Sequence, residues 1–179
     1  MVVKVTYMVT EENELVIHYE AETDSVTVLN LTNHSYFNLD GWEAHKDIVD
    51  HYVRIDADTF SPTDTYGMPT GDIEPVEGTP MDFREVHTIG ERTDSDYHNL
   101  VINHGYDHNY DLKPGSLRRT GCNLREDMPH GKGNLSLLFR GGLCLETQYP
   151  TNSMACPAFP SIVLRPGEHY DKTSVYRFK

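Results

Sequence analysis

The sequence predicts an all-β protein built as an antiparallel sandwich. Apolar and polar residues alternate with a period of two along most of the chain, which is the pattern of strands that are half buried. No stretch of helix length carries a 3.6-residue apolar period. Short candidate strands recur at regular intervals between turn-forming residues, a spacing typical of sandwiches.

The first two expected strands form a hairpin. Val3, Val5 and Tyr7 alternate with polar residues, and the EENE run at 11–14 reads as the connection. In the second strand, one face would carry four apolar side chains: Leu15, Ile17, Tyr19 and Ala21.

Further short strands are expected along the rest of the chain, at 25–31, 51–55, 100–102, 109–112, 135–139, 142–148 and within the 161–178 tail. The stretch at 56–80 holds four prolines and three glycines, so it should be extended and looped rather than helical. Near 116–134 no period survives, which predicts an irregular segment. The 179 residues suit one domain, spanning 1–179.

The net charge of the chain argues against some classes of binding partner. The chain has a formal net charge of −13. Nucleic acid and anionic membranes both need a basic surface, so neither is expected as a partner, whereas neutral ligands such as sugars are compatible with this charge. No stretch approaches the roughly 20 apolar residues of a membrane helix, and the charged, alternating first 22 residues do not resemble a signal peptide.

The cysteines predict a reducing compartment, most simply the cytoplasm. Cys122, Cys144 and Cys156 are odd in number and fit no zinc-binding spacing. A disulfide framework is therefore not expected.

Three short stretches concentrate polar side chains among apolar neighbours: Asn33-His34-Ser35, Asp107-His108-Asn109, and Glu146 with Gln148. Glu146 and Gln148 are two residues apart and would share one face of a strand, where a carboxylate beside an amide suits hydroxyl recognition. Each stretch also has a structural interpretation: a hydrogen-bonded histidine, an Asp/Asn turn, or a solvated strand edge.

A metal site built from His98, His104 and His108 is not expected. His104 and His108 are four residues apart, a spacing that aligns ligands only on a helix. Gly105 and Asn109 argue against a helix there.

Longer motifs resemble a known family. LTNHSYFNLDG, GTPMDFR, GYDHNYDL, LETQYP and FPSIVLRPGEHY occur in this order. They are similar to motifs of the galactose mutarotase (aldose 1-epimerase) family. The resemblance implies the large antiparallel β-sandwich of that family. It also implies interconversion of the α and β anomers of aldohexoses such as galactose and glucose, with no metal or other cofactor.

The resemblance also implies roles for individual residues. His34 would be the general acid at the sugar ring oxygen, and Glu146 the general base at the C1 hydroxyl. Both groups need pKa values not far from neutrality to exchange protons in either direction. Asp107 would bind sugar hydroxyls, with Asn33 and Gln148 as further substrate-binding residues.

Two departures from the family stand out. The N-x-x-H-G-G-like motif of the family's N-terminal half is absent, so the chain resembles the C-terminal portion, a sandwich truncated at the N-terminus. The stretch between GYDHNYDL and GLCLETQ also differs. Missing strands would leave apolar edges exposed, which predicts a partner chain that supplies them. The alternative function is a carbohydrate-binding remnant or an inactive fragment.

Overall fold

A computed structural model describes residues 1–179 except 42, 44, 114–119 and 124–137. The chain divides into two compact units. Unit 1 combines Met1–Leu31 with Ser161–Lys179, and unit 2 is Thr32–Pro160. In the part of the chain that the structure describes, no helix is long and apolar enough to cross a membrane.

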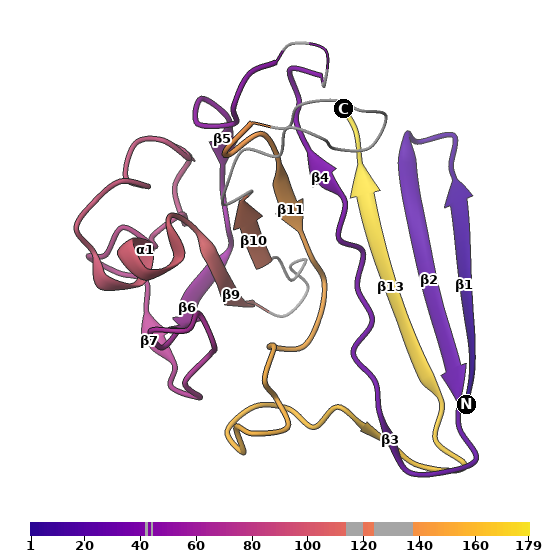
Figure 1. Ribbon diagram of the computed structural model, residues 1–179. Coiled ribbons are helices and arrows are strands. Elements are labelled where there is room, and N and C mark those ends of the chain that lie inside the picture. The colour runs from indigo at the N-terminus through magenta and orange to yellow at the C-terminus, as the bar shows by residue number, and fades with distance from the viewer. Residues whose placement is uncertain (42, 44, 114–119, 124–137) are drawn as a thin grey trace. The chain divides into compact units, whose positions relative to one another are not determined.

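Unit 1 contains a three-stranded antiparallel sheet in the order β1-β2-β13 (Figure 1) and a separate two-stranded sheet, β12-β3. The predicted hairpin is confirmed: Val2 pairs with Glu22 and Val9 with Leu15. Asn13 turns the chain with a φ of 59°, a conformation that asparagine tolerates. The strands are β1 (Val2–Val9), β2 (Glu14–Glu22), β3 (Thr27–Val28), β12 (Val163–Leu164) and β13 (Tyr170–Arg177).

Strand β2 has the apolar face that its alternation predicts. Ile17, Tyr19 and Ala21 are all buried. They pack with Leu29, Leu164 and Tyr170 into the core of unit 1. The intervening residues of β2 are more exposed, as expected for a strand with one buried side.

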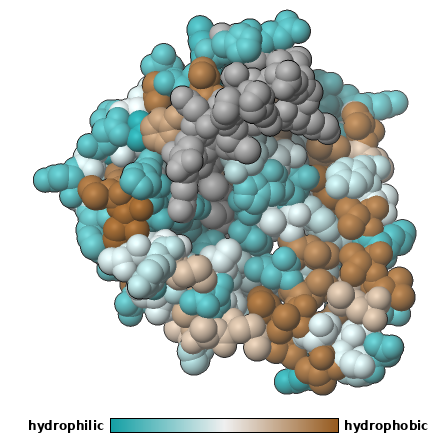
Figure 2. Space-filling view, viewed as in Figure 1, coloured by the Kyte–Doolittle hydropathy of each residue, from teal (hydrophilic) through white to brown (hydrophobic). Residues whose placement is uncertain are grey.

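Strand β1 differs, because all eight of its residues are exposed. Its apolar side chains include Val2 at 76% exposure, Tyr7 at 63% and Val9 at 80%. Among the described residues β1 pairs only with β2. Figure 2 shows apolar residues gathered over the strands of unit 1. Such a patch on an edge strand is unusual for a soluble protein without a partner.

Unit 2 contains a six-stranded antiparallel sheet in the order β4-β11-β10-β9-β6-β7 and a two-stranded sheet, β5-β8. The central strands β9, β10 and β11 follow one another in the sequence and lie side by side (Figure 1). The bounds are β4 (Tyr36–Phe37), β5 (Tyr52–Val53), β6 (Ala57–Ser61), β7 (Glu74–Pro75), β8 (His87–Thr88), β9 (Asp107–Leu112), β10 (Thr120–Asn123) and β11 (Leu143–Leu145).

The prediction of a strand at 100–102 is wrong. These residues belong to a short helix, α1 (His98–Asn103), which ends at His104 with a left-handed φ of 55°. Its inward face carries Asn99, Leu100 and Asn103. Two of those three buried residues are polar, so the spacing of apolar residues does not reveal the helix. The apolar run at 100–102 instead resembles a strand.

The expected irregular segment near 116–134 lies largely outside the described residues, and so do residues 135–137 of the expected 135–139 strand. Within the segment, β10 forms part of the central sheet. Other expected strands are present but shorter, because β3, β5 and β11 cover only two or three residues each.

Phe60 lies at the centre of the unit 2 core and is 0% exposed. Its ring contacts His108 edge-on at 5.8 Å and Tyr110 at 6.4 Å between ring centroids. Both partners are on β9, so this packing holds β6 against the strand that carries Asp107.

Replacing Phe60 by Ala should lower the free energy of unfolding by about 3–5 kcal/mol, because the change leaves a cavity that the fixed backbone cannot fill. Tyr66 is 87% exposed, and its replacement by Ala should change stability by less than about 0.5 kcal/mol. Urea titration followed by circular dichroism measures both. Equal losses in the two variants would contradict this account of the core.

Candidate functional site

Strand β4 brings the His34 segment to the edge of the central sheet. Tyr36 pairs with Cys144, and Phe37 pairs with Leu143 of β11. Before β4 the chain turns, and the Asn33 side-chain oxygen accepts a hydrogen bond from the Ser35 N–H at 3.1 Å. This local turn, typical of asparagine, sets where His34 leaves the backbone.

His34 and Glu146 lie in direct contact. The distance from His34 Nε2 to Glu146 Oε1 is 3.3 Å. The His34 side chain is 51% exposed, whereas that of Glu146 is 6% exposed. One partner is thus open to solvent and the other is enclosed by protein.

Cys144 contacts the other ring nitrogen of His34. Its Sγ lies 3.1 Å from His34 Nδ1, and Cys144 is 0% exposed. Because one neutral imidazole carries a single N–H, a thiol that donates to Nδ1 leaves the proton on Nε2, facing Glu146. The Tyr36 ring packs 5.2 Å from the His34 ring, centroid to centroid.

Gln148 holds the second oxygen of Glu146. Its Nε2 donates to Glu146 Oε2 at 3.0 Å. The carboxylate therefore has one oxygen on His34 and the other on Gln148. This arrangement fixes the plane of the carboxylate without engaging a second charged group.

Burial raises the pKa of Glu146, and the negative charge of Asp107 raises it further. The His34 charge and the Gln148 hydrogen bond act in the opposite direction, but the net effect is a pKa above the usual range of a glutamate. A carboxyl group with a raised pKa can both accept and return a proton near neutral pH.

Asp107 begins β9, and the sheet register places it in one row with Cys144. Both residues pair with Cys122 of β10, one from each side. Residues paired across antiparallel strands share a face of the sheet. The side chains of Asp107 and Cys144 are therefore on the same face.

A buried polar network supports the start of β9. His108 is 2% exposed, and its Nδ1 accepts a hydrogen bond from the Asp107 N–H at 3.1 Å. The other ring nitrogen lies 3.2 Å from Asn103 Nδ2, which also donates to Thr63 Oγ1 at 2.7 Å. Asn99 completes the network by accepting from the Thr63 N–H.

A family model described as aldose 1-epimerase matches residues 1–177. The chain belongs to the aldose 1-epimerase family. Human galactose mutarotase is 37% identical over 200 residues, covering 97% of this chain and 56% of that protein. Mouse galactose mutarotase is 39% identical with the same coverage. The aldose 1-epimerase of Escherichia coli is 30% identical, covering 97% of this chain and 57% of that protein.

Solved structures agree with the all-β antiparallel sandwich expected from the sequence. A GalM/aldose epimerase homologue from C. elegans superposes with a TM-score of 0.81 at 26% identity, covering 99% of this chain and 59% of that chain. Galactose 1-epimerase from Lactobacillus acidophilus, at 24% identity and a TM-score of 0.75, shares the fold. The chain spans little more than half the length of the curated relatives it matches.

The structure brings together most of the residues that the sequence singles out. His34, Glu146 and Gln148 form a chain of direct contacts, and Asp107 is close enough for its charge to act on Glu146. Asn33 differs, because its side-chain oxygen serves the turn that precedes β4.

Two members of this site were not predicted from the sequence. Cys144 contacts His34, although the same two-residue period that joins Glu146 to Gln148 also places Cys144 on that face. His108 supports Asp107 from the buried side of the sheet. Among the described residues, the histidines His98, His104 and His108 do not form a cluster that could hold a metal ion, whereas the potential ligand atoms of His34, Cys144 and Glu146 lie close together.

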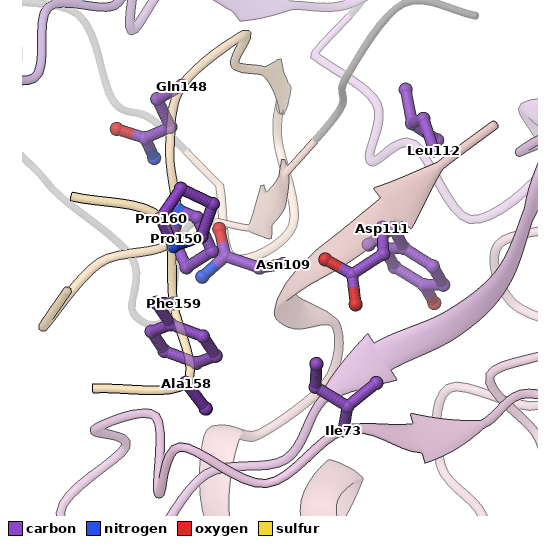
Figure 3. Close-up of a pocket in the computed structure, with 10 residues that line it drawn as sticks. Ile73, Asn109, Asp111, Leu112, Gln148, Pro150, Ala158, Phe159 and Pro160 are labelled. Atoms are coloured by element: carbon purple, nitrogen blue, oxygen red, sulfur yellow. The ribbon is translucent and has the colours of Figure 1, made fainter. Parts of the chain in front are cut away.

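A small pocket adjoins the site through Gln148 (Figure 3). It has a volume of about 100 Å³, and Asn109, Asp111 and Phe159 also line it. Typical small-molecule pockets enclose roughly 300–1,000 Å³. Neither His34 nor Glu146 lines this pocket, so it lies beside these two residues instead of enclosing them.

The raised pKa of Glu146 makes a prediction about stability and pH. A group whose pKa is higher in the folded state stabilises the fold below its unfolded pKa, and this contribution is lost as pH rises. As the pH rises above 4.5, the ordinary pKa of a glutamate, the Glu146→Gln variant should therefore gain stability relative to the chain that keeps Glu146. The comparison is best made between His34→Asn and the His34→Asn/Glu146→Gln double variant, because the titration of His34 is then absent.

Urea unfolding at several pH values measures the difference. Glu85 is exposed, and Glu85→Gln in the same background corrects for deleting one negative charge from an acidic chain. A difference between the Glu146 variants that shrinks with rising pH would show that burial does not control this carboxyl group.

Proposed function

We propose that this chain interconverts the α and β anomers of aldohexoses such as galactose and glucose. The observation that carries the proposal is the contact between His34 Nε2 and Glu146 Oε1 at 3.3 Å, in a chain of the aldose 1-epimerase family. The relatives named galactose mutarotase and aldose 1-epimerase support the same chemistry.

Mutarotation opens a cyclic hemiacetal and closes it on the other face. Glu146 removes the proton from the C1 hydroxyl while His34 gives a proton to the ring oxygen, and the C1–O5 bond breaks. The aldehyde carbon then rotates, and the two groups exchange roles as the ring closes. The C1–O5 bond breaks and re-forms with no net change of oxidation state, and the protons that must be transferred pass through His34 and Glu146.

The mutual contact of the acid and the base suits this reaction. The C1 hydroxyl oxygen and the ring oxygen are both bonded to C1, so two groups that touch each other can each reach one of them. Gln148 keeps Glu146 oriented, and Asp107, on the same face as Cys144, is placed to bind sugar hydroxyls. Such positioning accounts for a large share of the barrier lowering in enzymes.

His34→Asn and Glu146→Gln should each slow the enzymatic anomerisation by about 10²–10⁴-fold, because general acid–base groups contribute rates of this order. Polarimetry of freshly dissolved α-D-galactose and α-D-glucose measures the rate against the spontaneous reaction. His104→Asn and Glu85→Gln are the matched controls. Asparagine tolerates the left-handed backbone of His104, and Glu85 is exposed. Full activity in either site variant would refute the assigned roles.

A second candidate function is sugar binding without turnover. The chain spans 56% of the length of human galactose mutarotase, and its sequence lacks an N-x-x-H-G-G-like motif. Sugar binding seen by calorimetry, abolished by Asp107→Asn and not accompanied by faster anomerisation, would favour this function. Absence of sugar binding would identify an inactive fragment.

We further infer that the two units act as one domain. We also infer that the chain works in the cytoplasm. The family match spans residues 1–177 and so includes both units. Cys144 and Cys156 are buried and form no disulfide, which suits a reducing compartment.

We also propose that strands on another chain cover β1. The strand exposes all eight residues, and unpaired apolar edges promote association. In the absence of that partner the purified chain should self-associate with rising concentration. Tyr7→Lys, on β1, should reduce this association, whereas Tyr66→Lys, at an even more exposed tyrosine outside the strands, should not.

Light scattering coupled to size exclusion measures the association. A monomer at every concentration that also melts in one sharp transition would contradict the partner proposal.

A further inference from the structure

His34, Cys144 and Glu146 form a cluster of three different metal-ligating groups. Each offers one ligand atom, and the three atoms all lie within 4.8 Å of one another. We propose that this cluster is an inhibitory Zn²⁺ site, in which the cation binds the imidazole, the thiolate and the carboxylate together. The proposal goes beyond anomerisation, since that reaction uses no metal.

With one atom taken from each residue, the separations reach up to 4.8 Å, so the ligands must draw closer together to surround a small tetrahedral ion. Zinc binds sulfur at about 2.3 Å and nitrogen or oxygen at about 2.0–2.2 Å, so ligand atoms around it lie roughly 3.3–3.7 Å apart. The distance from Cys144 Sγ to His34 Nδ1 is 3.1 Å, and that from His34 Nε2 to Glu146 Oε1 is 3.3 Å. The cation needs one ring nitrogen, so the imidazole has to turn.

The ligand that must move is the one with freedom to do so. The His34 side chain is 51% exposed and lies in the segment before β4. Cys144 and Glu146 are both buried. Pairing with β4 and β10 holds Cys144 in β11, and Glu146 directly follows that strand. Two fixed ligands and one adjustable ligand make a site that can close around the ion.

The charges balance in the complex. Zn²⁺ carries two positive charges, the Cys144 thiolate and the Glu146 carboxylate carry one negative charge each, and His34 binds as the neutral imidazole. The thiol proton is released to solvent, as zinc binding to cysteine requires.

The donor set selects for zinc over the common hard cations. Mg²⁺ and Ca²⁺ prefer oxygen ligands, whereas thiolate and imidazole favour Zn²⁺ and related softer ions. Three protein ligands leave a fourth position for water. This arrangement is typical of exposed zinc sites.

Inhibition follows if the proposed function is correct, because the ion occupies both the acid and the base. Neither His34 nor Glu146 can then transfer a proton to or from the sugar. Binding itself does not depend on the proposed function, so it needs a readout that requires no turnover.

Co²⁺ provides that readout, because a cobalt–thiolate bond gives a charge-transfer band in the near ultraviolet. Titration of the full chain with Co²⁺, followed by displacement with Zn²⁺, should show this band in the wild type and in Cys156→Ser. Cys144→Ser keeps the volume of the side chain but should lose the band and bind zinc at least about 10-fold more weakly, since even outer-shell changes cost this much. Cys156 is the matched control, as a second buried free thiol that lies beside Pro69 and Gly71.

The removal of an exposed ligand tests the same site without disturbing the core. His34→Asn should also weaken binding by about 10-fold or more. A wild-type chain without the thiolate band would overturn the proposal, and so would a band that survives in Cys144→Ser. Binding without the band would assign the metal to other histidines among the ten in the sequence.

Polarimetry then separates this proposal from the proposed function. If the metal-free chain accelerates anomerisation, Zn²⁺ should suppress it and a chelator should restore it. A thiolate band in a chain that never accelerates anomerisation would support the metal site and refute the enzyme. Acceleration that Zn²⁺ does not reduce would refute inhibition and leave the enzyme intact.

Discussion

The site depends on the pairing of two very short strands, β4 and β11. Tyr36 and Cys144 are partners in that ladder, and it brings His34 to a cysteine 110 residues away in the sequence. Without this pairing His34 would sit in an exposed polar turn. With it, both ring nitrogens have defined neighbours, one a thiol and the other a carboxylate.

Glu146 and His34 differ in how far they are buried. Glu146 is enclosed, and the loss of water raises its pKa, whereas His34 is half exposed. A buried carboxyl group with a raised pKa beside a solvent-exposed imidazole suits the proposed reaction, in which the two groups exchange roles. A buried hydrogen-bond network supports the start of β9 and consists of Thr63, Asn99, Asn103 and His108. It gives each of these buried polar groups a partner and holds the backbone of Asp107 in place.

The same groups that suit proton transfer also suit a soft cation. A thiol beside an imidazole and a buried carboxylate is a set of zinc ligands, and here the set coincides with the acid–base pair. The proposed sugar chemistry uses two of these three side chains. Cys144 is the third, and it lies in β11 two residues before Glu146, which follows the end of that strand.

Local patterns in the sequence determined the strand class, the β1–β2 hairpin, the buried face of β2 and the three polar stretches, because the two-residue period and the turn residues act over a few neighbours. Tertiary structure alone decided the rest. The helix at His98–Asn103 exists because Asn99 and Asn103 find buried partners, which no apolar period reveals. Cys144 became part of the site only through a contact that joins distant strands, whereas Asn33 serves a local turn with Ser35. Side-chain neighbours across a sheet depend on register, and register is set by the packing of the whole sheet.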